Sequence, residues 1–122
     1  MLLKKNYLRA VLVIAVLGVA SFLLGARGGG SSPQLDVFAQ CLTEKEFVMY
    51  GAEWCSHCQN EKRAFGSSFR LIPYVECPKD PKKCLSAGID GYPTWLTPDG
   101  RRLEGEQGLK KLAAESGCPL AL

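Results

Sequence analysis

Residues 47–58 read FVMYGAEWCSHC and join an apolar run to two closely spaced cysteines. The run of residues 47–50 ends at Gly51, which predicts a short buried strand followed by a turn. Apolar side chains farther on predict a helix over residues 56–69, namely Ala64, Phe65 and Phe69. Cys55 and Cys58 therefore lie where a strand turns into the first turn of a helix.

The two-residue gap between Cys55 and Cys58 has a chemical meaning at the start of a helix. Unpaired N–H groups and the helix dipole favour a thiolate on the first cysteine, and the thiolate is the attacking species in disulfide exchange. We therefore expect Cys55 to be the nucleophile and Cys58 to resolve the mixed disulfide. His57, the single histidine of the chain, lies between them, and its ring is expected to stabilise the reduced form and make the disulfide more oxidising.

Two other roles for this cysteine pair are open. It could form a structural disulfide, although such bridges more often link distant segments than close a four-residue loop. Cys55 and Cys58 could also join Cys77 and Cys84 as the four thiolates of a zinc site. The second pair has C-x6-C spacing, unlike the tight spacing common in zinc ribbons, and an exported domain tends to hold its cysteines oxidised. We expect no metal and no cofactor beyond the redox cysteines.

The rest of residues 34–122 alternates helical and strand patterns. The expected order is α-β-α-β-α-β-β-α, an α/β fold with a mixed four-stranded sheet, because a strand-helix-strand unit implies a parallel pair and a hairpin adds antiparallel strands. The further elements are a first helix with Ser32 as cap and Pro33 at its first position, a strand over 71–77, a short helix over 80–88, strands over 93–97 and 101–104, and a helix over 108–116 that ends at Gly117.

The chain resembles the thioredoxin superfamily, because the strand–WCxxC–helix is followed, 34 residues after Cys58, by Tyr92-Pro93-Thr94. The likeness covers about residues 35–118 and implies a small thioredoxin-like fold. It also implies that Pro93 is cis and faces the cysteines, and that Tyr92, Pro93 and Thr94 contact a substrate that adds as a strand. Trp54 is expected to border this substrate site.

A narrower resemblance is to the thioredoxin-like domain of bacterial vitamin K epoxide reductase homologues, carried by residues 49–59, 74–77, 87–89 and 92–95. In those proteins the domain exchanges disulfides with a membrane enzyme that passes electrons to quinone. The resemblance implies that this chain is the detached partner of such an enzyme. Thioredoxins have a buried aspartate where this chain has Met49, which leaves Glu53 or Glu61 as a candidate proton acceptor. The Ser56-His57 dipeptide in place of Gly-Pro favours DsbA-like oxidants over cytosolic reductases.

The other four cysteines are expected to be structural. A bridge between Cys77 and Cys84 would close an eight-residue loop, and the narrower family often has a cysteine pair there, so we predict a disulfide worth about 2–3 kcal/mol. A second redox pair that relays electrons is the alternative. Cys41 and Cys118 remain by elimination; they form either a bridge between the two ends of the domain or two reduced, buried thiols.

The first 26 residues are expected to be a membrane anchor or a cleaved signal peptide. Residues 10–26 carry no charge, and seventeen helical residues span about 26 Å, slightly less than a hydrocarbon core of about 30 Å. The basic residues before them predict a cytoplasmic N-terminus and an exported remainder. Residues 27–33 form a flexible linker to the thioredoxin-like domain over residues 34–122.

The charge pattern excludes nucleic acid as a partner. Residues 34–122 carry 11 basic and 12 acidic side chains, so the excess of positive charge belongs to the N-terminus. No dimerisation segment is visible, so we expect a monomer.

The sequence thus predicts a single-pass protein of the cell membrane, with its catalytic domain on the periplasmic or extracytoplasmic side. The predicted function is thiol–disulfide exchange with exported proteins, to which it donates disulfides, with reoxidation by a quinone-linked, vitamin K epoxide reductase-like membrane partner. The alternatives are a tethered disulfide reductase, an isomerase, and a non-catalytic interaction module stabilised by zinc or disulfides.

Overall fold

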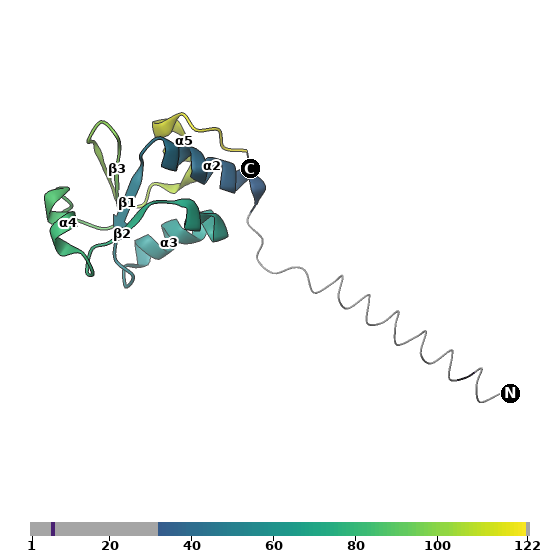
Figure 1. Ribbon diagram of the computed structural model, residues 1–122, viewed down its shortest axis with the longest axis horizontal. Helices are drawn as coiled ribbons and strands as arrows, with labels where there is room; N and C mark the ends of the chain where they lie inside the picture. Colours follow the sequence, from purple (N-terminus) through teal and green to yellow (C-terminus); the bar gives the residue numbers. More distant parts are fainter. Residues whose placement is uncertain (1–5, 7–31, 122) are drawn as a thin grey trace. The chain divides into compact units, whose positions relative to one another are not determined.

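The computed structural model describes Asn6 and residues 32–121. The order of its elements is α-β-α-β-α-β-β-α, as predicted, with one 3-10 helix added after the second α-helix (Figure 1). Their bounds are α2 Pro33–Glu44, β1 Val48–Gly51, α3 Ser56–Phe65, η1 Gly66–Leu71, β2 Tyr74–Glu76, α4 Pro81–Ser86, β3 Thr94–Leu96, β4 Arg102–Glu104 and α5 Gly108–Ser116.

The predicted anchor over residues 10–26 lies outside the described residues. Within the part of the chain that the structure describes, no helix has the length and apolar character needed to cross a membrane.

The four strands form one mixed sheet in the order β2-β1-β3-β4. β1 runs parallel to β2, with Tyr50 opposite Val75, and antiparallel to β3, with Met49 opposite Trp95. β3 and β4 are antiparallel neighbours. A parallel pair needs a long crossover, which α3 and η1 supply here. The mixed four-stranded sheet predicted from the sequence is therefore confirmed.

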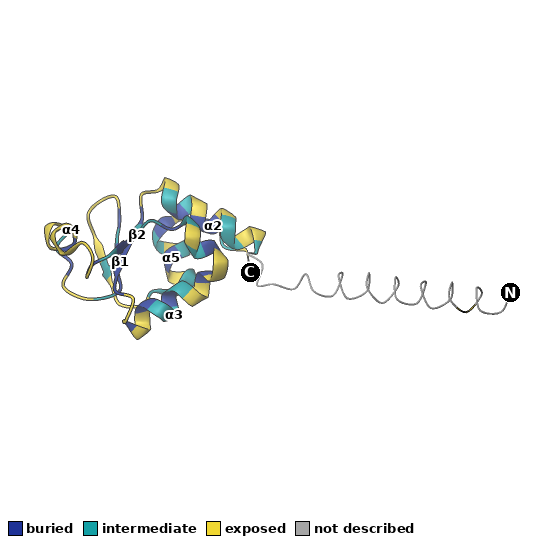
Figure 2. Cartoon of the chain, turned by 60° about the horizontal axis from the view of Figure 1, so that its bottom comes forward, coloured by how far each residue is buried: buried dark blue, intermediate teal, exposed yellow. Residues whose placement is uncertain are grey.

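Each face of the sheet has its own apolar cluster. The larger cluster joins α2, α3 and α5 to the strands, and its largest side chains include Phe38, Phe65, Met49 and Trp95. The smaller cluster packs α4 and the segment after it against the other face, through Tyr50, Val75, Cys77, Cys84 and Ile89. Figures 1 and 2 show α4 across the strands from α2 and α5, with the buried sides of the helices turned toward the sheet. The sheet is thus covered on both faces.

Two local predictions need correction. The helix predicted over residues 56–69 ends at Phe65, because Gly66 adopts a φ of 57°, a left-handed conformation open to a residue without Cβ, and the chain continues as η1. Ser32 stands at the N-cap of α2, but its hydroxyl donates to Gln34 Oε1 at 2.6 Å instead of accepting from the helix backbone.

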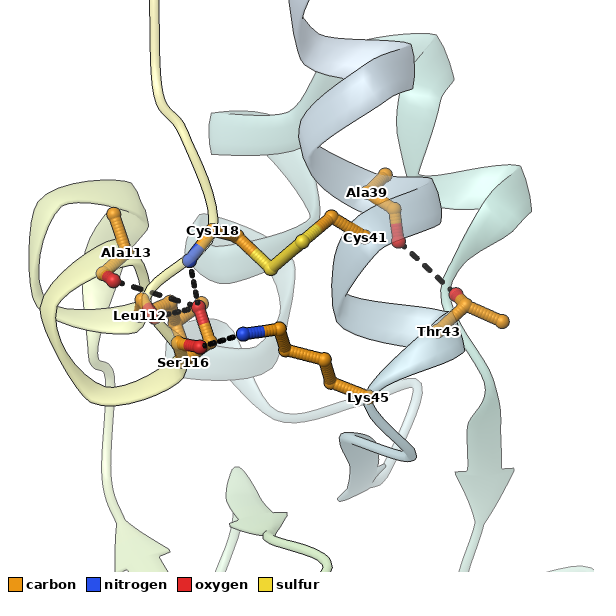
Figure 3. The surroundings of a disulfide bond; sticks show 8 residues. All are labelled: Ala39, Cys41, Thr43, Lys45, Leu112, Ala113, Ser116 and Cys118. Carbon is orange, nitrogen blue, oxygen red and sulfur yellow. Dashed lines mark hydrogen bonds between the residues drawn. A yellow bond between two sulfur atoms is a disulfide. The ribbon is translucent and has the colours of Figure 1, made fainter.

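A disulfide joins Cys41 of α2 to Cys118, just after α5 (Figure 3). Polar contacts flank the bridge: Lys45 Nζ donates to the Ser116 carbonyl at 2.6 Å, and the Cys118 amide donates to the Ser116 hydroxyl at 3.1 Å. Of the two roles that the sequence left open for these cysteines, the structure has the bridge. It fixes the first helix of the described domain to the last.

Candidate active site

Cys55 lies at the start of α3, directly after the turn that leaves β1. Its amide donates to the Ala52 carbonyl at 3.1 Å, and its Sγ accepts from the Cys58 amide at 3.4 Å as the N-cap of the helix. A hydrogen bond from the first helical turn to this sulfur stabilises negative charge on it. Cys55 is buried, with 8% of the residue exposed.

Cys58 is fully buried one turn farther into α3, and both cysteines are free thiols in the structure. Burial, with a further contribution from the hydrogen bond to Cys55, raises the pKa of Cys58 to about 12. The two thiols therefore differ in exposure, 8% for Cys55 and 0% for Cys58. The slight exposure of Cys55 and the full burial of Cys58 suit the attacking and resolving roles expected of them.

The loop before β3 faces the first cysteine. The Tyr92–Pro93 peptide bond is cis, and the Cys55 thiol donates to the Tyr92 carbonyl at 3.6 Å. Trp54 is 75% exposed and meets the Tyr92 ring edge-on, with ring centroids 6.0 Å apart. Thr94 is buried, and its hydroxyl donates to the Gly91 carbonyl at 2.9 Å. Of the expected substrate residues, Tyr92 thus contacts Cys55 through its carbonyl and Trp54 through its ring, while Thr94 is buried in the fold.

His57 points toward the loop before α5. Its Nδ1 lies 3.1 Å from Glu106 Oε2, which also accepts from Asn60 Nδ2 at 3.2 Å. Both contacts lower the pKa of Glu106, and the contact with His57 has the larger effect. The sequence missed this carboxylate because it lies 49 residues from His57. The imidazole beside the cysteines is therefore itself held by an exposed acid.

A second group that the sequence missed lies behind the cysteines, around Gly51. A β-carbon built on Gly51 would be 2.8 Å from Cys58 Sγ and 3.2 Å from the Tyr74 hydroxyl. That hydroxyl donates to Glu76 Oε2 at 2.6 Å, and Glu76 Oε1 accepts from the Glu53 amide at 2.8 Å. The period of two along a strand is the signal that puts Tyr74 and Glu76 on one side of β2.

The ionisable groups of this second site act on one another. Burial and the hydrogen bond to Glu76 raise the pKa of Tyr74 above its usual range. Burial opposes the ionisation of Glu76, but hydrogen bonds from Tyr74 and the Glu53 amide outweigh it and lower the pKa of that carboxyl. Lys62 Nζ lies 3.8 Å from the centroid of the Tyr74 ring. A neutral phenol, a carboxylate and a cation are thus grouped behind Cys58.

Glu61 is a fully buried carboxyl on α3. It accepts from Trp95 Nε1 at 3.2 Å and from the amides of Gln107 at 3.0 Å and Gly108 at 3.2 Å. Burial raises its pKa, against the effect of these hydrogen bonds. The three donors belong to β3 and to the start of α5. Glu61 therefore links α3 to both of these elements by hydrogen bonds.

Cys77 and Cys84 form a disulfide that closes the loop between β2 and α4. Both residues are buried, and the Cys77 amide donates to the Gly51 carbonyl at 2.9 Å, which ties this loop to the end of β1. With these sulfurs bonded to each other, the four-thiolate zinc arrangement is not formed. The described residues hold no group of three or more side chains arranged to bind a metal.

Comparison with known proteins agrees with this geometry. No family model matches the chain. It is 39% identical, over 99 residues, to the thiol-disulfide oxidoreductase LTO1 of Arabidopsis thaliana, a match that covers 74% of this chain and 26% of the relative. It is 31% identical, over 88 residues, to the thioredoxin domain-containing protein 5 homolog of Drosophila melanogaster. That match covers 64% of this chain and 21% of the relative. These matches support a place in the thioredoxin superfamily.

The chain spans about a quarter of the length of these two relatives. The mixed four-stranded sheet and the cysteine pair at the start of α3 are compatible with a thioredoxin-like fold.

Proposed function

We propose that this thioredoxin-like chain is a protein disulfide oxidoreductase that works by thiol–disulfide exchange at Cys55 and Cys58. The observation that carries the proposal is the environment of Cys55 Sγ. This sulfur accepts a hydrogen bond from the Cys58 amide at 3.4 Å and lies 3.6 Å from the Tyr92 carbonyl oxygen. A sulfur at a helix N-terminus is favoured as a thiolate. The neighbouring carbonyl and the exposed Trp54 ring offer an extended peptide a place beside it.

In this proposal an oxidised Cys55–Cys58 disulfide accepts two electrons from a substrate dithiol. A substrate thiolate attacks Cys55 Sγ, the Cys55–Cys58 bond breaks, and Cys58 leaves as a thiolate that takes up a proton. A second substrate thiolate then attacks the mixed disulfide, which leaves the substrate oxidised and both cysteines reduced. The full burial of Cys58 supports its part, because Cys55 is the more exposed of the two cysteines.

The proposed setting is the outer face of a membrane. The uncharged residues 10–26 would anchor the chain there, and the substrates would be exported proteins. A quinone-linked membrane enzyme of the vitamin K epoxide reductase type would reoxidise the dithiol, as the sequence resemblance implies.

The direct test is oxidation of a synthetic peptide with two cysteines by the full chain in mild detergent, followed by mass spectrometry. The oxidised protein should convert stoichiometric peptide to its disulfide form, and the Cys55→Ser variant should convert none. A double variant, Cys77→Ser with Cys84→Ser, should retain the reaction, which separates exchange at the helix from a relay through the second pair. Peptide oxidation by Cys55→Ser at the wild-type rate would contradict the proposal.

A further inference from the structure

The thiol of Cys58 and the hydroxyl of Tyr74 share one small space beside Gly51. A β-carbon in that space would lie 2.8 Å from the sulfur and 3.2 Å from the oxygen, so only a glycine leaves it open. Tyr74 Oη in turn donates to Glu76 Oε2 at 2.6 Å. The sulfur and the hydroxyl thus lie near the same point beside Gly51, and the hydroxyl is hydrogen-bonded to a carboxylate that is only partly buried.

Cys58 needs a proton acceptor whenever it acts as a nucleophile. It attacks as a thiolate, yet burial raises its pKa to about 12, so at neutral pH it is a thiol that must give its proton to a base. Cys55 cannot be this base during the attack, because its sulfur is then bonded to the substrate. The buried Glu61 is engaged by three donors from other elements, Trp95 and the amides at the start of α5.

The charged and titratable groups around Cys58 come from α3 and β2. On α3, Cys55 opposes and Lys62 favours ionisation of the Cys58 thiol. On β2, the charge of Cys58 opposes ionisation of the Tyr74 phenol, whose hydroxyl donates to Glu76. Lys62 and Lys79 favour the carboxylate form of Glu76. The carboxylate is thus ionised and ready to receive a proton, while the phenol stays protonated and can only pass one on.

We propose that Tyr74 and Glu76 form the proton relay of Cys58, an inference that rests on the thiol–disulfide exchange proposed above. The Cys58 proton passes to Tyr74 Oη, directly or through one water molecule, as the phenol proton passes to Glu76 Oε2. The Cys58 thiolate attacks Cys55 Sγ, the Cys55–Cys58 bond forms, and the bond from Cys55 to the substrate sulfur breaks. The substrate leaves as a thiolate with the electron pair, and Glu76 releases the proton to solvent.

The same route serves the reverse reaction. When a substrate thiolate breaks the Cys55–Cys58 bond, Cys58 leaves as a thiolate in a buried site. The Tyr74 hydroxyl then gives its proton to this thiolate, and the phenol is reprotonated by a proton that enters from solvent through Glu76. The relay therefore governs the step at Cys58 in both directions and leaves the attack at Cys55 unchanged.

The test separates these two steps with oxidised glutathione as the probe. Reduced full chain in mild detergent is mixed with the probe, quenched with acid at short times, alkylated and weighed intact. The mass distinguishes the dithiol, the Cys55–glutathione adduct and the final disulfide. For Glu76→Gln and Tyr74→Phe we expect adduct formation at the wild-type rate. Adduct resolution at pH 7 should be slower by roughly tenfold or more, since a positioned base contributes at least this much.

The pH profile distinguishes a relay from a structural effect. The difference in adduct-resolution rate between each variant and the wild type should shrink as pH rises toward 10, because hydroxide then removes the Cys58 proton. The double variant should resolve the adduct no more slowly than the slower single variant. The matched controls Tyr50→Phe and Glu104→Gln remove the same groups at other strand positions and should resolve at the wild-type rate.

Two results would overturn the relay while the proposed function stands. One is resolution of the adduct by Glu76→Gln and Tyr74→Phe at the wild-type rate from pH 6 to 10. The other is slowing by one constant factor at every pH, which reports a displaced Cys58. If wild-type protein forms no Cys55–glutathione adduct at all, the proposed function itself fails, and the relay with it.

Discussion

Replacing Gly51 by alanine should disturb the resolving cysteine without touching the attacking one. The new β-carbon would lie 2.8 Å from Cys58 Sγ and 3.2 Å from the Tyr74 ring and hydroxyl. Heavy atoms in favourable contact lie about 3.5–4.0 Å apart, so the sulfur must move by roughly 1 Å. Overpacking of this kind costs about 1–3 kcal/mol, because neither the buried sulfur nor the strand can yield freely.

The assay for Gly51→Ala combines urea unfolding of the reduced full chain with the glutathione reaction described above. We expect a loss of about 1–3 kcal/mol in the free energy of unfolding and slower resolution of the Cys55–glutathione adduct. Gly91→Ala is the matched control, because a β-carbon there meets nothing within 4 Å; its change should stay within about 0.5 kcal/mol. Equal stability and equal resolution rates in the two variants would refute the packing described around Gly51.

Four further outcomes are expected. Cys41→Ser with Cys118→Ser removes a bridge across 77 residues and should lower the free energy of unfolding by roughly 2–5 kcal/mol in urea titrations, whereas an unchanged midpoint would contradict a structural bridge. Glu61→Ala leaves three hydrogen-bond donors without their acceptor. In the same urea titrations it should lower the free energy of unfolding by about 3–5 kcal/mol. Because burial raises the pKa of Glu61, wild-type stability should fall as pH rises from the ordinary carboxyl range through that higher pKa, and Glu61→Gln should flatten this part of the pH profile. His57→Ala should raise the pKa of Glu106 toward its ordinary value in carboxyl NMR titrations, and no change would contradict the contact between them.

The sequence alone predicts the parts of this molecule that depend on local spacing. The gap between Cys55 and Cys58 after an apolar run is enough to place them at the start of a helix. The alternation of helical and strand patterns gives the element order and the mixed sheet. Both follow from residues that are neighbours along the chain, so no knowledge of packing is needed.

The sequence does not predict contacts that depend on register and on backbone angles. The grouping of Tyr74 with Cys58 requires β2 to lie beside β1 and Gly51 to leave the space open. Glu106 meets His57 only because the loop before α5 returns to α3. The early end of α3 depends on the φ of Gly66, although the apolar spacing continues to Phe69.

The reduction potential of the Cys55–Cys58 pair tests the central claim most directly. The full chain is equilibrated in glutathione buffers of graded composition, quenched, alkylated and weighed, so that each cysteine pair is followed separately. Exchange with substrate thiols as a disulfide donor predicts a two-electron transition of this pair at about −120 to −180 mV. A transition near about −270 mV would contradict the donor and indicate a reductase, and the absence of any transition at these cysteines would contradict thiol–disulfide exchange altogether.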